Sequence, residues 1–190
     1  MSTQRKDRKD AILDAVLDMV VERGFQKIPM SLVSKRAGAS PGVIYHHFPS
    51  KEDMIHALYA RIKSAKRQVF LEGYSVDVPM QEAFVKMWIN AYHFYRSRRR
   101  ESQFLDLYEH SSFSKLRPLE EPSEQEDIRS HAQKAFRPKK SGGVLKDLSP
   151  AAIDEMSWGL ALRLAKREEA INPAMLKKIA EVVWTAIAAE

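Results

Sequence analysis

The chain has 190 residues, of which 44% are apolar, and it carries a formal net charge of +6 at pH 7 and no cysteine. This length allows a hydrophobic core without cross-links, and the missing cysteine excludes disulfides, thiolate metal ligands and cysteine nucleophiles. No apolar run exceeds four residues and the first ten residues are rich in charge, so the sequence predicts neither a membrane-spanning helix nor a secretory signal. We therefore expect a cytoplasmic protein.

The basic excess lies entirely in the first third of the chain. Residues 1–67 contain 13 lysines and arginines against seven aspartates and glutamates, which gives +6, while the remaining residues contain 18 of each sign. A basic segment joined to a neutral one indicates a polyanionic partner for the basic part alone. A surface excess that only keeps the protein soluble has the same composition, so charge by itself leaves both interpretations open.

Apolar residues recur at helical spacing along most of the chain, and strand-like alternation is hard to find, so the predicted fold class is all-α. A serine or asparagine followed by proline marks three of the helix starts, at Ser40, Ser149 and Asn172. Residues 113–150 are rich in proline and glycine, and we expect loops and mobility there. The predicted helices cover residues 5–23, 31–37, 40–48, 51–72, 80–98, 101–112, 124–136, 151–169 and 173–188.

Residues 31–48 combine two short predicted helices with a tight turn at Gly38. Packed on a preceding amphipathic helix, this pattern is typical of a helix-turn-helix, whose second helix lies in the major groove of DNA. In the second helix Ile44 and Phe48 share one face and are expected to anchor in the core. The opposite face then remains for a duplex, and the helix has no acidic residue that would repel phosphate.

Longer sequence motifs surround this turn. They are Glu22-Arg23-Gly24-Phe25, then Arg36-Ala37-Gly38-Ala39-Ser40, then Pro41-Gly42-Val43-Ile44-Tyr45-His46-His47-Phe48-Pro49-Ser50-Lys51-Glu52. Together they resemble the DNA-binding domain of TetR-family transcriptional regulators over about residues 8–58. The resemblance implies an N-terminal three-helix DNA-binding domain, residues 1–50, and a C-terminal helical ligand-binding and dimerisation domain, residues 51–190, with about nine helices in all.

The resemblance also implies DNA contacts. Tyr45, His47 and Lys51 would contact phosphates, and the start of the second helix would face base edges or sugars. The expected DNA-binding residues are Ser31, Lys35, Arg36, Ser40, Pro41, Gly42, Val43, Tyr45, His46, His47 and Lys51. Because this helix has no Arg, Asn or Gln, the usual bidentate readers of guanine and adenine, readout is left to His46, thymine methyl contacts, side chains of the preceding helix, or DNA shape.

The last two predicted helices carry apolar stripes, through which the resemblance implies dimerisation. The expected interface residues are Ile153, Met156, Leu160, Leu164, Leu176, Ile179, Val183 and Ile187. Packing in the core of the single chain would bury the same residues. One apolar stripe cannot both form the core and contact a second copy of the chain.

Aromatic residues suggest a ligand pocket in the C-terminal domain. The candidates are Phe84, Trp88, Tyr92, Tyr95, Phe104, Tyr108 and Trp158. Aromatic residues at helical spacing are more often core, but as a group they could line an apolar cavity for a hydrophobic or aromatic small molecule. The basic run at 96–100 is interpreted as a solvated helix end favoured by the helix dipole, and the run at 137–140 as a loop.

We therefore predict a ligand-responsive transcriptional regulator, in particular a repressor that leaves a palindromic double-stranded DNA operator when its effector binds. The alternative is an effector-independent helix-turn-helix activator or architectural protein. An enzyme is not expected, because no catalytic group set or phosphate-binding glycine loop stands out. The six histidines show no metal-ligand spacing, and neither a cofactor nor a membrane partner is expected.

Overall fold

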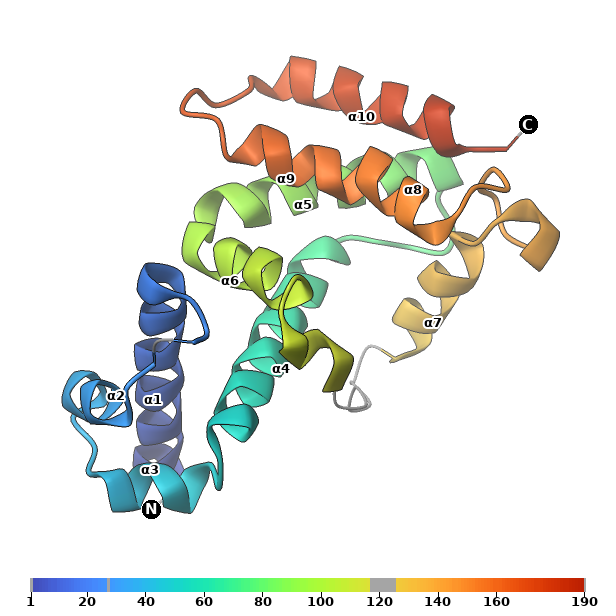
Figure 1. The fold of residues 1–190 in the computed structure, drawn as a ribbon. Coiled ribbons are helices and arrows are strands. Elements are labelled where there is room, and N and C mark those ends of the chain that lie inside the picture. Colours follow the sequence, from blue (N-terminus) through green and yellow to red (C-terminus); the bar gives the residue numbers. More distant parts are fainter. Residues whose placement is uncertain (1, 27, 117–125, 190) are drawn as a thin grey trace. The chain divides into compact units, whose positions relative to one another are not determined.

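The computed structural model describes residues 2–26, 28–116 and 126–189, leaving aside the side chains of residues 2–7, 116 and 126–129. Its regular elements are helices (Figure 1), which confirms the all-α prediction. The α-helices are α1 (Ser2–Arg23), α2 (Met30–Ala37), α3 (Pro41–His47), α4 (Lys51–Phe70), α5 (Met80–Ser97), α6 (Arg99–Glu109), α7 (Glu126–Ala135), α8 (Pro150–Asp154), α9 (Leu160–Ala165) and α10 (Pro173–Ile187). A π-helical turn, Glu155–Gly159, joins α8 directly to α9.

The chain divides into two compact units. The first consists of residues 1–64 and 99–120, and the second of residues 65–98 and 121–190. The first half of α4 belongs to the first unit because its buried side chains pack there: Tyr59, for example, stacks on Tyr108 of α6 with ring centroids 4.1 Å apart. A functional boundary at residue 50 therefore stays a prediction.

The core of the first unit lies between α1 and the helices that follow it. Its fully or almost fully buried members are Ile12, Val16, Val20, Val33, Ile44 and Phe48. Gly38 ends α2 with a φ of 59°, a left-handed conformation that glycine adopts without strain, and its N–H donates to the Ser34 carbonyl. This turn directs the chain into α3, as the helix-turn-helix pattern predicts.

In the second unit, α9 and α10 both pack along α5 (Figure 1). The indole Nε1 of Trp88 donates to the Ser157 carbonyl at 3.0 Å. The Arg96 guanidinium donates to the carbonyls of Arg167 at 2.9 Å and Glu168 at 2.8 Å, just beyond the end of α9. Arg96 thus satisfies carbonyls at a helix C-terminus, which corrects its interpretation as part of a solvated helix end.

The proline- and glycine-rich stretch includes residues 117–125, which lie outside the described residues, but its part after α7 is held by hydrogen bonds. After α7, the Val144 N–H donates to the Ala135 carbonyl at 3.0 Å, and the Lys146 N–H donates to the Ile187 carbonyl at 2.8 Å. The backbone also passes so close to itself that a Cβ on Gly143 would lie 2.1 Å from the Arg137 carbonyl oxygen. Residues 136–149 therefore form a loop that hydrogen bonds anchor to α7 and to the end of α10.

Within the described part of the chain, no helix is long and apolar enough to cross a membrane.

Candidate nucleic-acid interface

Helix α3 has only seven residues, and local capping defines both of its ends. At the start, the Ser40 hydroxyl accepts the Val43 N–H at 3.4 Å, and Pro41 occupies the first turn. At the end, the Phe48 N–H donates to the Ile44 carbonyl at 2.9 Å. The side chains of Ile44 and Phe48 are 0% and 3% exposed, so these two residues fasten the helix to the core.

The remaining side of α3 faces outward. Ser40, Pro41, Gly42, Tyr45 and His46 are exposed, and the Tyr45 ring is the largest apolar group among them, at 48% exposure. Val43 and His47, the other two expected contact residues of this helix, are partly exposed. A Cβ added to Gly42 would meet no atom within 4 Å, so the space over the start of the helix is open. The structure thus gathers all seven expected contacts of residues 40–47 on one short, uncharged helix.

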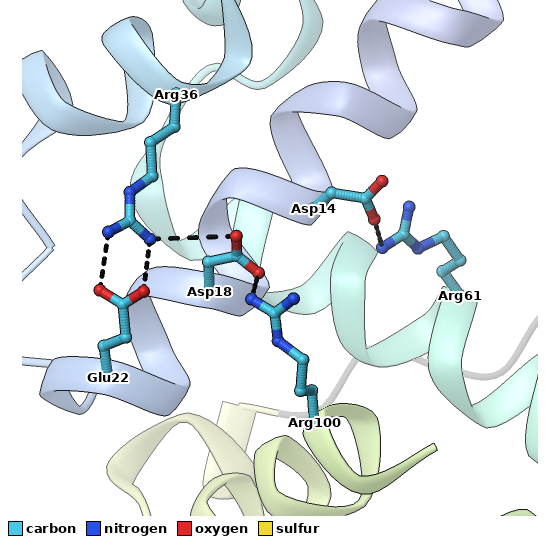
Figure 2. Close-up of polar contacts among 6 residues, drawn as sticks. All are labelled: Asp14, Asp18, Glu22, Arg36, Arg61 and Arg100. Carbon is cyan, nitrogen blue, oxygen red and sulfur yellow. Dashed lines mark hydrogen bonds and ion pairs between the residues drawn. The ribbon is translucent and has the colours of Figure 1, made fainter. Parts of the chain in front are cut away.

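Arg36, on α2, is paired with acidic residues of α1. Its Nη1 and Nη2 atoms donate to the two carboxylate oxygens of Glu22 at 2.8 and 2.7 Å, and Asp18 lies 3.9 Å away (Figure 2). The hydrogen bond to Arg36 holds the pKa of Glu22 below its ordinary value and raises the pKa of Arg36. The guanidinium thus fastens α2 to α1, and a DNA contact from Arg36 stays a prediction.

Lys51 also has a role within the first unit. Its Nζ donates to the Phe25 carbonyl at 2.8 Å and so ties the start of α4 to the turn after α1. The start of α4 is further held by a reciprocal capping box, in which the Asp53 N–H donates to the Ser50 hydroxyl and the Ser50 N–H donates to the Asp53 carboxylate. An additional phosphate contact from Lys51 stays a prediction.

Ser31 and Lys35, the two other expected contacts on α2, are exposed one turn apart.

An acidic stripe on α1 holds the neighbouring helices through arginines. The acids recur every four residues and contact Arg61 of α4, Arg100 of α6 and Arg36 of α2 (Figure 2). The acids are Asp10, Asp14, Asp18 and Glu22. In the sequence these acids show only a regular spacing, which a solvated helix face also shows, so their arginine partners could not be predicted.

The seven candidate pocket aromatics are divided between the two units. Phe104 and Tyr108 belong to the first unit, where Phe104 packs against Phe25 and the Tyr108 hydroxyl lies 2.9 Å from Nδ1 of His56. The other five, Phe84, Trp88, Tyr92, Tyr95 and Trp158, belong to the second unit. Phe104 and Tyr108 are fully buried in the first unit, and their part in a ligand pocket stays a prediction.

In the second unit the aromatic residues pack on one another. The Phe84 ring centroid lies 5.7 Å from that of Trp158 and 5.4 Å from that of Trp184. Trp88 and Tyr92 are fully buried, and burial raises the pKa of the Tyr95 hydroxyl, with a further contribution from the charge of Asp154. Trp158 alone among the five is only partly buried. Core packing thus accounts for most of this set.

The second unit contains a separate surface cavity of about 650 Å³. It is lined by Arg137, Pro138, Lys140, Ser141, Asp147, Leu148, Ser149 and Pro150, and by none of the predicted aromatics. Among the residues that the structure describes, no group of three or more histidines and acids could hold a metal ion.

The predicted dimer residues on α10 need a correction. Leu176, Val183 and Ile187 are 1%, 4% and 1% exposed, so they belong to the core of the second unit. The apolar residues that α10 exposes are Met175 and Val182, each one position earlier, with Ile179 partly exposed. The error arose because α10 is apolar on two sides. In the preceding helical segment Met156 is exposed, and Ile153, Leu160 and Leu164 are partly exposed.

Two family models match the chain. Residues 12–58 match the model described as bacterial regulatory proteins of the tetR family, and residues 79–188 match the tetracyclin repressor-like C-terminal domain. An uncharacterized HTH-type transcriptional regulator of Haemophilus influenzae is 24% identical over 98% of this chain and 99% of its own length. The HTH-type transcriptional regulator UidR of Escherichia coli is 38% identical over 58 residues, which are 30% of this chain and 30% of that relative.

Solved structures share the fold over the full chain. A TetR family transcription regulator from Marinobacter aquaeolei superposes with a TM-score of 0.83, covering 100% of both chains at 16% sequence identity. A TetR-family transcriptional regulator from Haemophilus influenzae gives a TM-score of 0.74 at 21% identity, covering 98% of this chain and 99% of that one.

The Glu22–Arg36 ion pair predicts a pH-dependent stability. Because the pKa of Glu22 is lowered from 4.5 in the folded state, its contribution is complete above about pH 4.5 and is lost as the pH falls through the folded value. Thermal unfolding of Glu22→Gln should therefore give a lower Tm than wild type at pH 7 and low salt, with a difference that shrinks toward pH 3 and at high salt.

The exposed glutamate Glu52 provides the matched control, and Glu52→Gln should change the Tm less than Glu22→Gln at pH 7. A Tm difference between wild type and Glu22→Gln that is equal at pH 7 and pH 3 would show that this ion pair does not contribute to the fold.

Proposed function

Because the chain belongs to the TetR family of bacterial regulatory proteins, we propose that it is a ligand-responsive repressor. It binds a palindromic operator through α3 and leaves that operator when a small hydrophobic or aromatic effector binds the second unit. The observation that carries the DNA-binding half is the outward side of α3, which is exposed, free of acidic residues and open above Gly42. A helix of this kind can approach the floor of a major groove closely.

Affinity comes from cations that lie beside α3 rather than on it. Lys35 is exposed on α2, and the Nζ atom of Lys9 on α1 lies 5.7 Å from the centroid of the Phe48 ring. Lysines in these positions neutralise phosphates and release counterions, so operator binding weakens steeply with salt. Phosphate contacts of this sort set the position of the protein on the duplex, and α3 reads the sequence.

A second copy of the chain pairs through the exposed apolar side of α10 and of the preceding helical segment. This side is supported by Met156, Met175 and Val182, which are 38%, 48% and 62% exposed in the single chain. Two-fold pairing uses the same patch on both copies. It places two α3 helices in successive major grooves, about 34–36 Å apart, and requires an operator with palindromic half-sites.

The effector acts by preferring the conformation that does not fit the operator, and a coupling of about 1–3 kcal/mol is typical of such systems. Support comes from apolar side chains that border the core of the second unit and are only partly buried, among them Leu71, Val78, Phe136 and Trp158. The alternative, an effector-independent activator or architectural protein, predicts operator affinity that no small molecule changes.

Binding-site selection with the purified protein and a random duplex library tests DNA recognition. The selected sites should share a palindromic sequence, and Tyr45→Ala should weaken binding to that sequence by about tenfold or more at fixed salt, because it removes the largest exposed side chain of α3. Fluorescence anisotropy measures the affinity, and sedimentation confirms that the dimer is unchanged. Leu107→Ala, which truncates an exposed leucine on α6, is the control and should bind like wild type. Equal binding by Tyr45→Ala and Leu107→Ala would refute the docking through α3.

The dimer surface has its own test. Val182→Asp places a charge at the centre of the exposed apolar side of α10, so it should shift the protein to monomers and weaken operator binding without unfolding it. Val76 is 52% exposed in the segment before α5, and Val76→Asp should leave both properties unchanged. If Val182→Asp sediments as a dimer, the protein does not pair through this side.

A further inference from the structure

The groups that α3 offers to base edges are unusual for a DNA-reading helix. Bidentate recognition of guanine or adenine requires Arg, Lys, Asn or Gln, and residues 40–48 contain none of these. Arg36, the guanidinium nearest in sequence, is held on both nitrogens by Glu22. Paired hydrogen bonds from these side chains are therefore not available on α3 itself.

The start of α3 instead presents small and apolar groups. Pro41 is exposed, Gly42 has open space above its Cα, and Val43 is partly exposed beside them. The one hydroxyl there, Ser40 Oγ, already accepts the Val43 N–H as the helix cap. The resulting surface is apolar and leaves open space in which a methyl group can pack.

The major groove offers one apolar group that distinguishes base pairs, the C5-methyl of thymine. We propose that α3 reads its operator chiefly through thymine methyl groups, which pack against Pro41, Gly42 and Val43. The proposal rests on the proposed function, because it requires α3 to lie in the major groove. It defines the class of operator: each half-site has thymine at fixed positions facing the start of α3.

The expected size of the effect follows from hydrophobic burial. A buried methyl contributes enough transfer free energy to change binding by about fourfold. Replacing a read thymine by deoxyuridine removes this methyl and leaves the base-pair hydrogen bonds in place, so each such replacement should weaken binding by about fourfold. Thymines outside the read positions should tolerate the same replacement.

The experiment uses the full-length protein and two random duplex libraries, one made with thymidine and one with deoxyuridine. The thymidine library gives the operator, and single deoxyuridine replacements along it map the methyl groups that contribute. The same duplexes are then titrated with Val43→Ala, which shortens the side chain against the methyl, and with Gly42→Ala, whose added Cβ enters the open space that the methyl would occupy. Val76→Ala, at an exposed position of the second unit, serves as the control variant.

The proposal predicts a loss of about fourfold per replacement in wild type and in Val76→Ala. Val43→Ala should discriminate less between thymine and uracil, and Gly42→Ala should lose more affinity for the thymine duplex than for the uracil duplex. Equal affinity for both duplexes at every position would overturn the proposal while leaving DNA binding intact. If uracil weakens binding equally in wild type, Val43→Ala and Gly42→Ala, the loss arises from DNA shape rather than from contact with the methyl group. This result would also overturn the proposal. If neither library yields a preferred site, the proposed function itself fails.

Discussion

A helix of seven residues is not stable by itself. The helix-turn-helix therefore depends on the contacts that hold α3 against the rest of the first unit. Two buried side chains, Ile44 and Phe48, anchor it, and the Ser40 cap with Pro41 sets its start. This arrangement uses only one side of the helix for folding. The side chains on the other side of α3 take no part in the core and are accessible to a partner. The surface formed by Pro41, Gly42 and Val43 is therefore fixed in position although it is exposed to solvent.

The acidic stripe of α1 divides the basic residues of the first unit into two kinds. Arg36, Arg61 and Arg100 pair with acids of α1 and hold α2, α4 and α6 in place. Each exposed ion pair of this type stabilises the fold only weakly. The paired arginines nevertheless connect helices within the first unit. Lysines such as Lys9 and Lys35 lie beside α3 at the surface. In the proposed function, the positive charge of the N-terminal third thus serves folding and DNA affinity through different residues, while readout falls to a helix without Lys or Arg.

Sequence reasoning succeeded where structure is determined locally. Ser40-Pro41 and Asn172-Pro173 start helices because a cap and a fixed proline φ act within one turn, and the spacing of Ile44 and Phe48 identifies the buried side of α3. It failed where the answer depends on packing between distant segments. Nothing near Arg36 in the sequence indicates Glu22 as its partner, and α10 is apolar on two sides, so spacing alone could not tell Val182 from Val183. The close approach at Gly143 likewise exists only in the folded loop.

The central claim is that the uncharged helix α3, fixed by Ile44 and Phe48, is the surface that meets DNA. Amide hydrogen exchange of the protein with and without its selected operator tests this claim most directly. The account predicts slower exchange on DNA binding in residues 31–51, centred on α3, and little direct change in the loop of residues 136–149. Unchanged exchange in α3, or protection concentrated in that loop, would contradict it.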